Sequence, residues 1–154
     1  MDNIQLSINF KSDPSKIRQI KLFSTFDYYV QSKLKMKQVG MLQLSVDSPM
    51  GASKITSNGH LELVQDKPPL IDSITRTIYD VDPLTDVIYS QYTIEELTEA
   101  YNHRNEKVNY VATNFVQNLG SRFSTTLEVN IHVPKSQEIV YRPGVLETIK
   151  FAWV

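Results

Sequence analysis

Hydrophobic and polar residues alternate along much of the chain, beginning close to its first residue. Ile4, Leu6, Ile8 and Phe10 are separated by polar residues, and this period of two is typical of a strand with one face in water. The same alternation recurs in Ile20, Leu22, Phe26, Tyr28 and Val30; in Leu34 and Met36; in Leu42, Leu44 and Val46; in Leu61 and Leu63; in Val108, Tyr110 and Ala112; and in Leu127, Val129, Ile131 and Val133. The pattern predicts a mainly β protein.

One dipeptide gives a strong local turn signal. Asn58-Gly59 precedes the alternating pair Leu61 and Leu63, and Asn-Gly favours the type I′ hairpin turn, which needs positive φ at both central residues. The sequence therefore predicts a hairpin turn at these two residues. Two further short strands are predicted within 70–92 and from Gln137 to Arg142.

A single helix is predicted from Ile94 to His103. Thr93 and Glu96 have the spacing of a capping box, in which each side chain accepts a hydrogen bond from the other residue's backbone N–H. Ile94, Leu97 and Tyr101 form one apolar stripe. Tyr101 is expected to seat the helix, and Arg104 is a candidate ion-pair or carbonyl partner at its end.

Seven or eight short strands with one helix favour an antiparallel β-sandwich. We predict one domain, residues 1–144. Residues 145–154 are interpreted as the start of a membrane helix cut off by the end of the sequence.

The last residues combine a strand-breaking Pro143-Gly144 with features of a membrane entry point. Lysine and tryptophan are residue types expected where a helix meets the bilayer interface, and Lys150, Phe151 and Trp153 lie in the final segment. Periodicity alone leaves a second interpretation open, an amphipathic C-terminal helix packed on the domain.

Composition excludes some functional classes. The 154 residues include 16 basic and 17 acidic side chains, for a net charge of −1, and a nucleic-acid-binding domain normally has a basic excess. There is no cysteine, so neither disulfides nor thiolate metal sites are available. The sequence contains no run of about 20 apolar residues, the length that spans a bilayer.

Candidate catalytic and metal-binding residues do not form a recognisable motif. His60, His103 and His132 lie on three predicted elements without ligand spacing, and they are interpreted as surface histidines. Asp80, Asp82 and Asp86 lack the glycine and the closing glutamate of a calcium loop, so they are interpreted as turn residues. No nucleotide-binding or nucleophile motif is present. We expect no enzyme activity and no cofactor.

Three lysines share one face of a predicted strand. Lys33, Lys35 and Lys37 alternate with apolar residues, which is typical of an edge strand protected against aggregation. The alternative is contact with anionic headgroups or an acidic partner.

Three segments together resemble the transmembrane protein 231 family. Tyr141–Val154 is similar to the family segment Tyr-x-Pro-Gly followed by Glu-x-Ile/Val-Lys-Phe-Ala-Trp, which enters the second membrane helix. Ser57–Leu63 resembles its Asn-Gly-x-Leu-x-Leu hairpin. Ala100–Asn105 resembles its Ala-Tyr-x-x-Arg-Asn helix end. The C-terminal block is the most specific of the three.

The resemblance implies a protein with two membrane helices and this domain between them, on the extracellular side of the ciliary membrane. It also implies residence at the ciliary transition zone, in the Meckel-syndrome-type assembly. The implied partners are tectonics, meckelin-like receptors and small transmembrane subunits, with lipid contacted by the flanking helices and no nucleic acid bound.

Two other classes of function are left open by the residues themselves. One is a β-sandwich that binds a lipid or small ligand in an apolar cavity. The other is a viral structural protein that assembles with itself.

Overall fold

The computed structural model describes residues 2–31, 35–48, 50–68, 76–77, 79, 93–119, 124–143 and 148–149. Its elements are β1 (Asp2–Phe10), the 3-10 helix η1 (Pro14–Lys16), β2 (Gln19–Gln31), β3 (Lys35–Asp47), β4 (Lys54–Gln65), β5 (Arg76–Thr77), α2 (Ile94–Asn102), β6 (Glu106–Asn118) and β7 (Thr125–Val133). The prediction of a mainly β fold with one short α-helix is confirmed.

The described strands form two sheets of mixed direction. One has the order β1-β7-β4-β6 and the other β2-β3-β5. β1 pairs antiparallel with β7, but β4 is parallel to β7 and β5 is parallel to β3. The prediction of a purely antiparallel arrangement is therefore wrong, because alternation along a strand does not reveal the direction of its neighbour.

Two details of the predicted strands are also corrected. β2, β3 and β6 each contain 13 residues. The prediction that all strands are short is therefore wrong for these three. No strand runs from Gln137 to Arg142, where only Arg142 forms an isolated bridge. Side chains bond this segment instead: the Gln137 side chain donates to the Leu61 carbonyl at 3.0 Å, and the Val140 N–H donates to Gln65 Oε1 at 3.0 Å.

The predicted hairpin turn at Asn58-Gly59 is wrong, because both residues lie inside the continuous strand β4. Among the described residues only Gly51 has a positive φ, of 74°. A Cβ on Gly51 would lie 2.4 Å from the Pro14 carbonyl oxygen. The turn that needs glycine therefore comes before β4, in the connection from β3.

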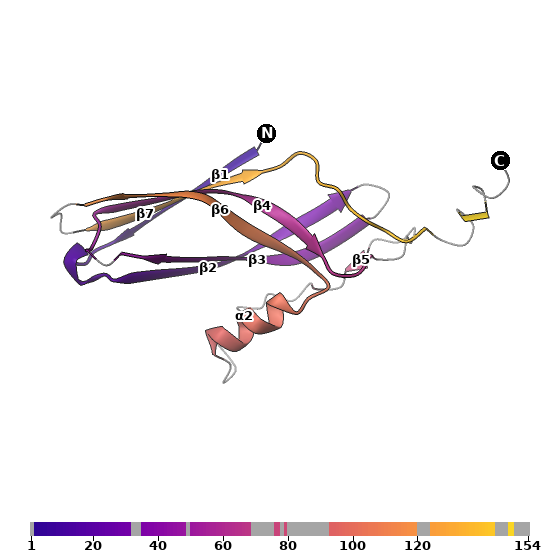
Figure 1. Cartoon of the computed structure of the whole chain (residues 1–154), viewed down its shortest axis with the longest axis horizontal. Coiled ribbons are helices and arrows are strands. Elements are labelled where there is room, and N and C mark those ends of the chain that lie inside the picture. Colours follow the sequence, from indigo (N-terminus) through magenta and orange to yellow (C-terminus); the bar gives the residue numbers. More distant parts are fainter. Residues whose placement is uncertain are drawn as a thin grey trace. The chain divides into compact units, whose positions relative to one another are not determined.

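The chain divides into two compact units. Unit 1 comprises residues 1–24, 42–62 and 108–137. Within it, β1, β7, β4 and β6 form one layer, and the first part of β2 with the last part of β3 forms another (Figure 1). Its buried apolar side chains include Ile20, Leu42, Leu44, Val46, Ile55, Val108, Leu127, Val129 and Ile131.

Unit 2 comprises residues 25–41, 63–107 and 138–154. It contains α2, whose capping box is confirmed: the Glu96 N–H donates to Thr93 Oγ1 at 3.3 Å, and the Thr93 N–H donates to Glu96 Oε2 at 2.8 Å. Leu97 and Tyr101 are buried, whereas Ile94 is 45% exposed. The apolar stripe is therefore narrower than predicted.

The proposed membrane-helix start, 145–154, lies almost entirely outside the described residues, of which only Thr148 and Ile149 belong to it and are helical. Among the described helices, none has both the length and the apolar character to span a bilayer. The boundary between residues 144 and 145 stays a prediction.

Candidate functional site

The outward side of the four-stranded sheet in unit 1 carries an array of polar side chains. Alternate residues of β7, from Thr125 to Ile131, are buried, so the residues between them point away from the core. Strand register places those residues beside matching polar residues of β1 and β4. We call this array the polar face; its residues are Asn3, Gln5, Ser7 and Asn9 of β1, Thr126, Glu128, Asn130 and His132 of β7, and Lys54, Thr56, Asn58 and His60 of β4.

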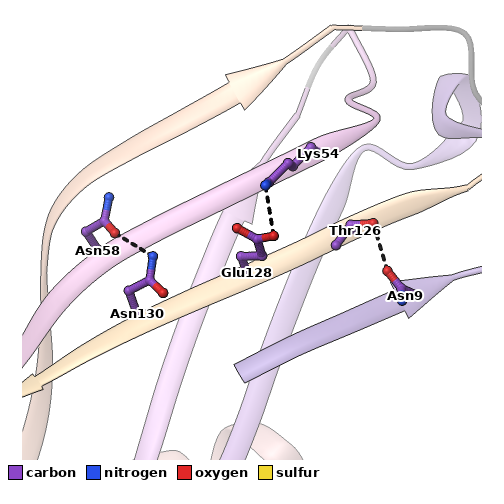
Figure 2. Close-up of polar contacts among 6 residues, drawn as sticks. All are labelled: Asn9, Lys54, Asn58, Thr126, Glu128 and Asn130. Carbon is purple, nitrogen blue, oxygen red and sulfur yellow. Dashed lines mark hydrogen bonds and ion pairs between the residues drawn. The ribbon is translucent and has the colours of Figure 1, made fainter. Parts of the chain in front are cut away.

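Side chains of the polar face bind one another across neighbouring strands. Thr126 Oγ1 donates to Asn9 Oδ1 at 2.8 Å, and Lys54 Nζ lies 2.8 Å from Glu128 Oε1 (Figure 2). An ion pair this exposed contributes at most about 1 kcal/mol to stability. It does, however, leave the centre of the face close to neutral.

Asn58 is the middle member of a chain of amides that crosses three strands. Asn130 Nδ2 donates to Asn58 Oδ1 at 2.8 Å, as Figure 2 shows, and Asn58 Nδ2 donates to Asn114 Oδ1 of β6 at 2.7 Å. The Asn58 side chain accepts one hydrogen bond through its oxygen and donates the other through its nitrogen. Both bonds can form only when the three strands are aligned in this register. Asn58 therefore fixes the alignment of β4 with β7 and β6.

The backbone of β6 lies very close to Gly59 of β4. A Cβ at Gly59 would lie 2.4 Å from the Val111 carbonyl oxygen and 2.6 Å from Cζ of Tyr110. These distances are far below van der Waals contact, so only glycine fits without a backbone shift. The glycine is required for space rather than for a turn.

The hydrogen bonds of β6 indicate a change of phase along this strand. Ser57 and Asn58 are consecutive, so their side chains lie on opposite faces of β4. Ser57 Oγ hydrogen-bonds Tyr110 Oη at 2.7 Å, whereas Asn58 bonds Asn114. Residues four apart share one face of a regular strand, so β6 must change phase between Tyr110 and Asn114.

Burial raises the pKa of Tyr110 above its ordinary value, while its hydrogen bond to Ser57 opposes this effect.

In unit 2, Arg104 is held between two tyrosine rings. Its guanidinium carbon lies 4.6 Å from the Tyr79 ring centroid and 4.9 Å from the Tyr101 centroid, and Nη1 donates to the Val39 carbonyl at 2.8 Å. Both rings present π faces that attract a cation. Burial lowers the pKa of Arg104 from its ordinary value, but a guanidinium stays protonated at neutral pH.

Asn105 joins neighbouring segments through its backbone. Its N–H donates to Tyr79 Oη at 3.4 Å, and its carbonyl accepts from the Asp66 N–H at 2.8 Å. Together with the Arg104 contacts, these bonds attach the segment after α2 to β3 and to Tyr79. Tyr101, Arg104 and Asn105 are therefore gathered in one part of unit 2.

A buried polar network links β2, β3 and β6 beside this arginine. Tyr28 Oη donates to Gln38 Oε1 at 2.6 Å, and Gln38 Nε2 donates to Glu106 Oε2 at 3.4 Å. Burial is the largest cause that raises the pKa of Tyr28, and the nearby Tyr101 and Glu106 add to it. Because buried polar groups are costly when unpaired, these bonds make the three strands depend on one another.

The remaining predicted site residues are placed only in part. Pro143 is exposed, while Gly144, Lys150, Phe151 and Trp153 lie outside the described residues. Of the three alternating lysines, Lys37 lies with Nζ 5.6 Å from the centroid of the Tyr29 ring. Within the part of the chain that the structure describes, no group of three or more His, Asp or Glu side chains is arranged to hold a metal ion.

Sequence reasoning missed the polar face, although its signal was present. The residues opposite each apolar set in β1 and β7 are almost all amides, hydroxyls or imidazoles rather than the lysines and glutamates usual on a solvated strand. Knowledge of which strands are neighbours was needed to see that these side chains meet.

The fold and these networks define a mainly β protein in which described polar side chains connect neighbouring strands and segments. Comparison of the sequence with known families is more specific: the chain belongs to the transmembrane protein 231 family, whose model matches residues 1–154. This is a family of membrane proteins. The resemblance drawn from the three sequence segments is therefore confirmed.

Individual relatives agree with the family match. The chain is 29% identical to transmembrane protein 231 of Gallus gallus over all of its length, covering 49% of that protein. It is 25% identical to the Xenopus tropicalis protein, again over its whole length and 50% of the relative. Against the Homo sapiens protein it is 26% identical over 88% of the chain and 43% of the relative. The chain thus spans about half the length of these relatives, and no solved structure matches it.

Proposed function

We propose that this chain is the extra-cytoplasmic domain of a non-catalytic structural subunit of the ciliary transition-zone membrane complex. In this role it contributes to the diffusion barrier that controls which membrane proteins enter the cilium, and to cilium assembly. The observation that carries the proposal is the family match over all 154 residues.

The internal bonding of the domain supports a scaffolding role. The polar groups of the amide chain through Asn58 form hydrogen bonds between strands, and Arg104 bonds the segment after α2 to β3. Within each unit, such bonding offers a preorganised surface, which reduces the entropy lost when a partner docks. The proposed partners are the ectodomains of tectonics, meckelin-like receptors and small transmembrane subunits.

The attachment to the membrane is proposed at the C-terminal segment. Pro143 and Gly144 would end the domain, and Lys150, Phe151 and Trp153 would cross the interface into a second membrane helix. Lysine can extend its ammonium group towards the headgroups, and indole favours the boundary between hydrocarbon and water. Flanking helices would supply the lipid contacts.

Imaging and transport in ciliated cells test the proposal. The tagged full-length protein is expected at the base of the cilium, and its loss is expected to admit a plasma-membrane marker into the cilium. Re-expression of the natural protein should restore exclusion, and so should the control variant Lys135→Gln at an exposed position. A protein spread over other membranes, or a cilium whose composition is unchanged by its loss, would refute the proposal.

The tagged protein purified from these cells also distinguishes the ciliary proposal from a lipid-binding function. A lipid-binding domain would co-purify with a stoichiometric lipid detectable by mass spectrometry, and would not need transition-zone partners. The whole chain matches vertebrate membrane proteins, and this match argues against the interpretation as a viral structural protein.

A further inference from the structure

Two of the three histidines of the chain are brought together by the topology of unit 1. His60 of β4 and His132 of β7 are direct register partners in the parallel pair. Each lies two residues beyond Asn58 and Asn130, whose side chains meet on the polar face at 2.8 Å. Since residues two apart share a face of a strand, both imidazoles belong to the polar face.

The spacing of the two strands suits a shared metal ion. Neighbouring strands lie about 4.8 Å apart, and two imidazole nitrogens at about 2.0–2.1 Å from a tetrahedral ion are roughly 3.3 Å apart. The side chains therefore need to converge by only about 1.5 Å, which ordinary χ1 and χ2 adjustment supplies. Both residues are half-buried, so their imidazoles lie at the surface within reach of an ion.

A neighbouring amide prepares His132 as a ligand. His132 Nδ1 lies 3.0 Å from Asn3 Oδ1 of β1. An amide oxygen can only accept, so the tautomer that makes this bond carries its proton on Nδ1 and leaves the Nε2 lone pair for a metal ion. Metal-binding histidines are commonly oriented in this way, by donating their second ring N–H to an oxygen.

The charges nearby permit a cation. Lys54 is paired with Glu128 and lies three outward positions away from His60 along β4. Glu62, exposed and one outward position beyond His60, adds negative charge near the pair. The register neighbour of His132 in β1 is Asn3, which is uncharged.

We propose that His60 and His132 form an open two-imidazole site for a borderline divalent cation, Zn²⁺ or Cu²⁺. Imidazole is a preferred ligand for both ions. No third His, Asp or Glu among the described residues joins the pair, so water completes the coordination. The inference does not depend on the proposed ciliary function.

Calorimetric titration of the 154-residue chain with ZnCl₂ and CuCl₂ at pH 7.4 in a non-chelating buffer tests the site. One ion is expected to bind per chain, with affinity reduced at least tenfold in His60→Gln and in His132→Gln. His103→Gln is the matched control, because His103 is the C-cap residue of α2 in unit 2 and lies 3.8 Å from Glu99. Asn3→Ala should weaken binding by about tenfold, as expected for a group that orients a ligand.

A second measurement needs no variant and so does not depend on whether one folds. Substoichiometric Cu²⁺, which is paramagnetic, should broaden the NMR signals of the His60 and His132 rings before those of His103. Acidification to pH 5.5 should release the ion, because protons compete for imidazole nitrogen. The absence of binding by the natural chain would overturn the inference, as would equal broadening of all three histidines or loss of binding in His103→Gln.

Discussion

Gly59 and Asn58 show how one dipeptide can carry a local preference that tertiary contacts override. Asn-Gly favours a tight turn when the two residues are considered alone. In the folded chain, however, the Asn58 side chain forms hydrogen bonds with Asn130 and Asn114. Gly59 lies against the backbone of β6 at Val111. Those contacts come from strands 50 or more residues away in sequence, so neighbouring residues could not have predicted them.

Replacing Gly59 by alanine is expected to destabilise the protein by about 1–3 kcal/mol, the usual cost of overpacking a filled site. The new methyl group would meet the Val111 carbonyl oxygen, a backbone atom that cannot rotate away. The free energy of unfolding in urea is the measurement. Ser7→Ala, on an exposed position of the polar face, is the control and should change stability by less than about 0.5 kcal/mol. Equal stability of the two variants would mean that β6 adjusts freely.

At the scale of elements, α2 is the part that the sequence predicted best. Its start depends on Thr93 and Glu96, which are only three residues apart, so the information needed is local. Strand existence was also predictable from alternation. Strand direction and order were not, because the parallel pairing of β4 with β7 depends on residues 72 positions apart and leaves no trace in either strand's own periodicity.

Loss of the N-cap hydroxyl tests this element. Thr93→Ala should reduce the free energy of unfolding by about 1 kcal/mol, because the Glu96 N–H loses its acceptor. Thr93→Ser keeps the oxygen and should retain most of the stability. Urea denaturation of both variants gives the comparison. If serine is as harmful as alanine, the contribution of Thr93 comes from its methyl group and not from capping.

At the scale of the whole molecule, each unit contains a tyrosine whose pKa is raised by burial, Tyr110 in unit 1 and Tyr28 in unit 2. In the unfolded chain both phenols ionise near pH 10. Above that pH the unfolded state binds fewer protons than the folded state, so stability falls as pH rises. The contribution is fully present below about pH 10.

Urea denaturation at fixed ionic strength between pH 7 and 11 measures this loss. Tyr28→Phe should lower stability at pH 7 by about 1 kcal/mol, since the bond to Gln38 is lost. It should also flatten the decline above about pH 10, because one ionisable group is gone. Tyr29→Phe, at a side chain 59% exposed, is the control. An unchanged slope in Tyr28→Phe would show that other groups cause the alkaline loss.

The pairing of β1 with β7 has a consequence for how the chain acquires its structure. Asp2 aligns with Val133 and Phe10 with Thr125, so among the described strands β1 pairs with one that follows it more than 100 residues later in the sequence. Contacts of such long sequence separation slow folding, because a long loop must close before they form. Until β7 emerges from the ribosome, the backbone of Asp2–Phe10 cannot form this pairing, and the segment carries almost no charge. A nascent chain of this kind depends on chaperones or on the speed of translation for its solubility.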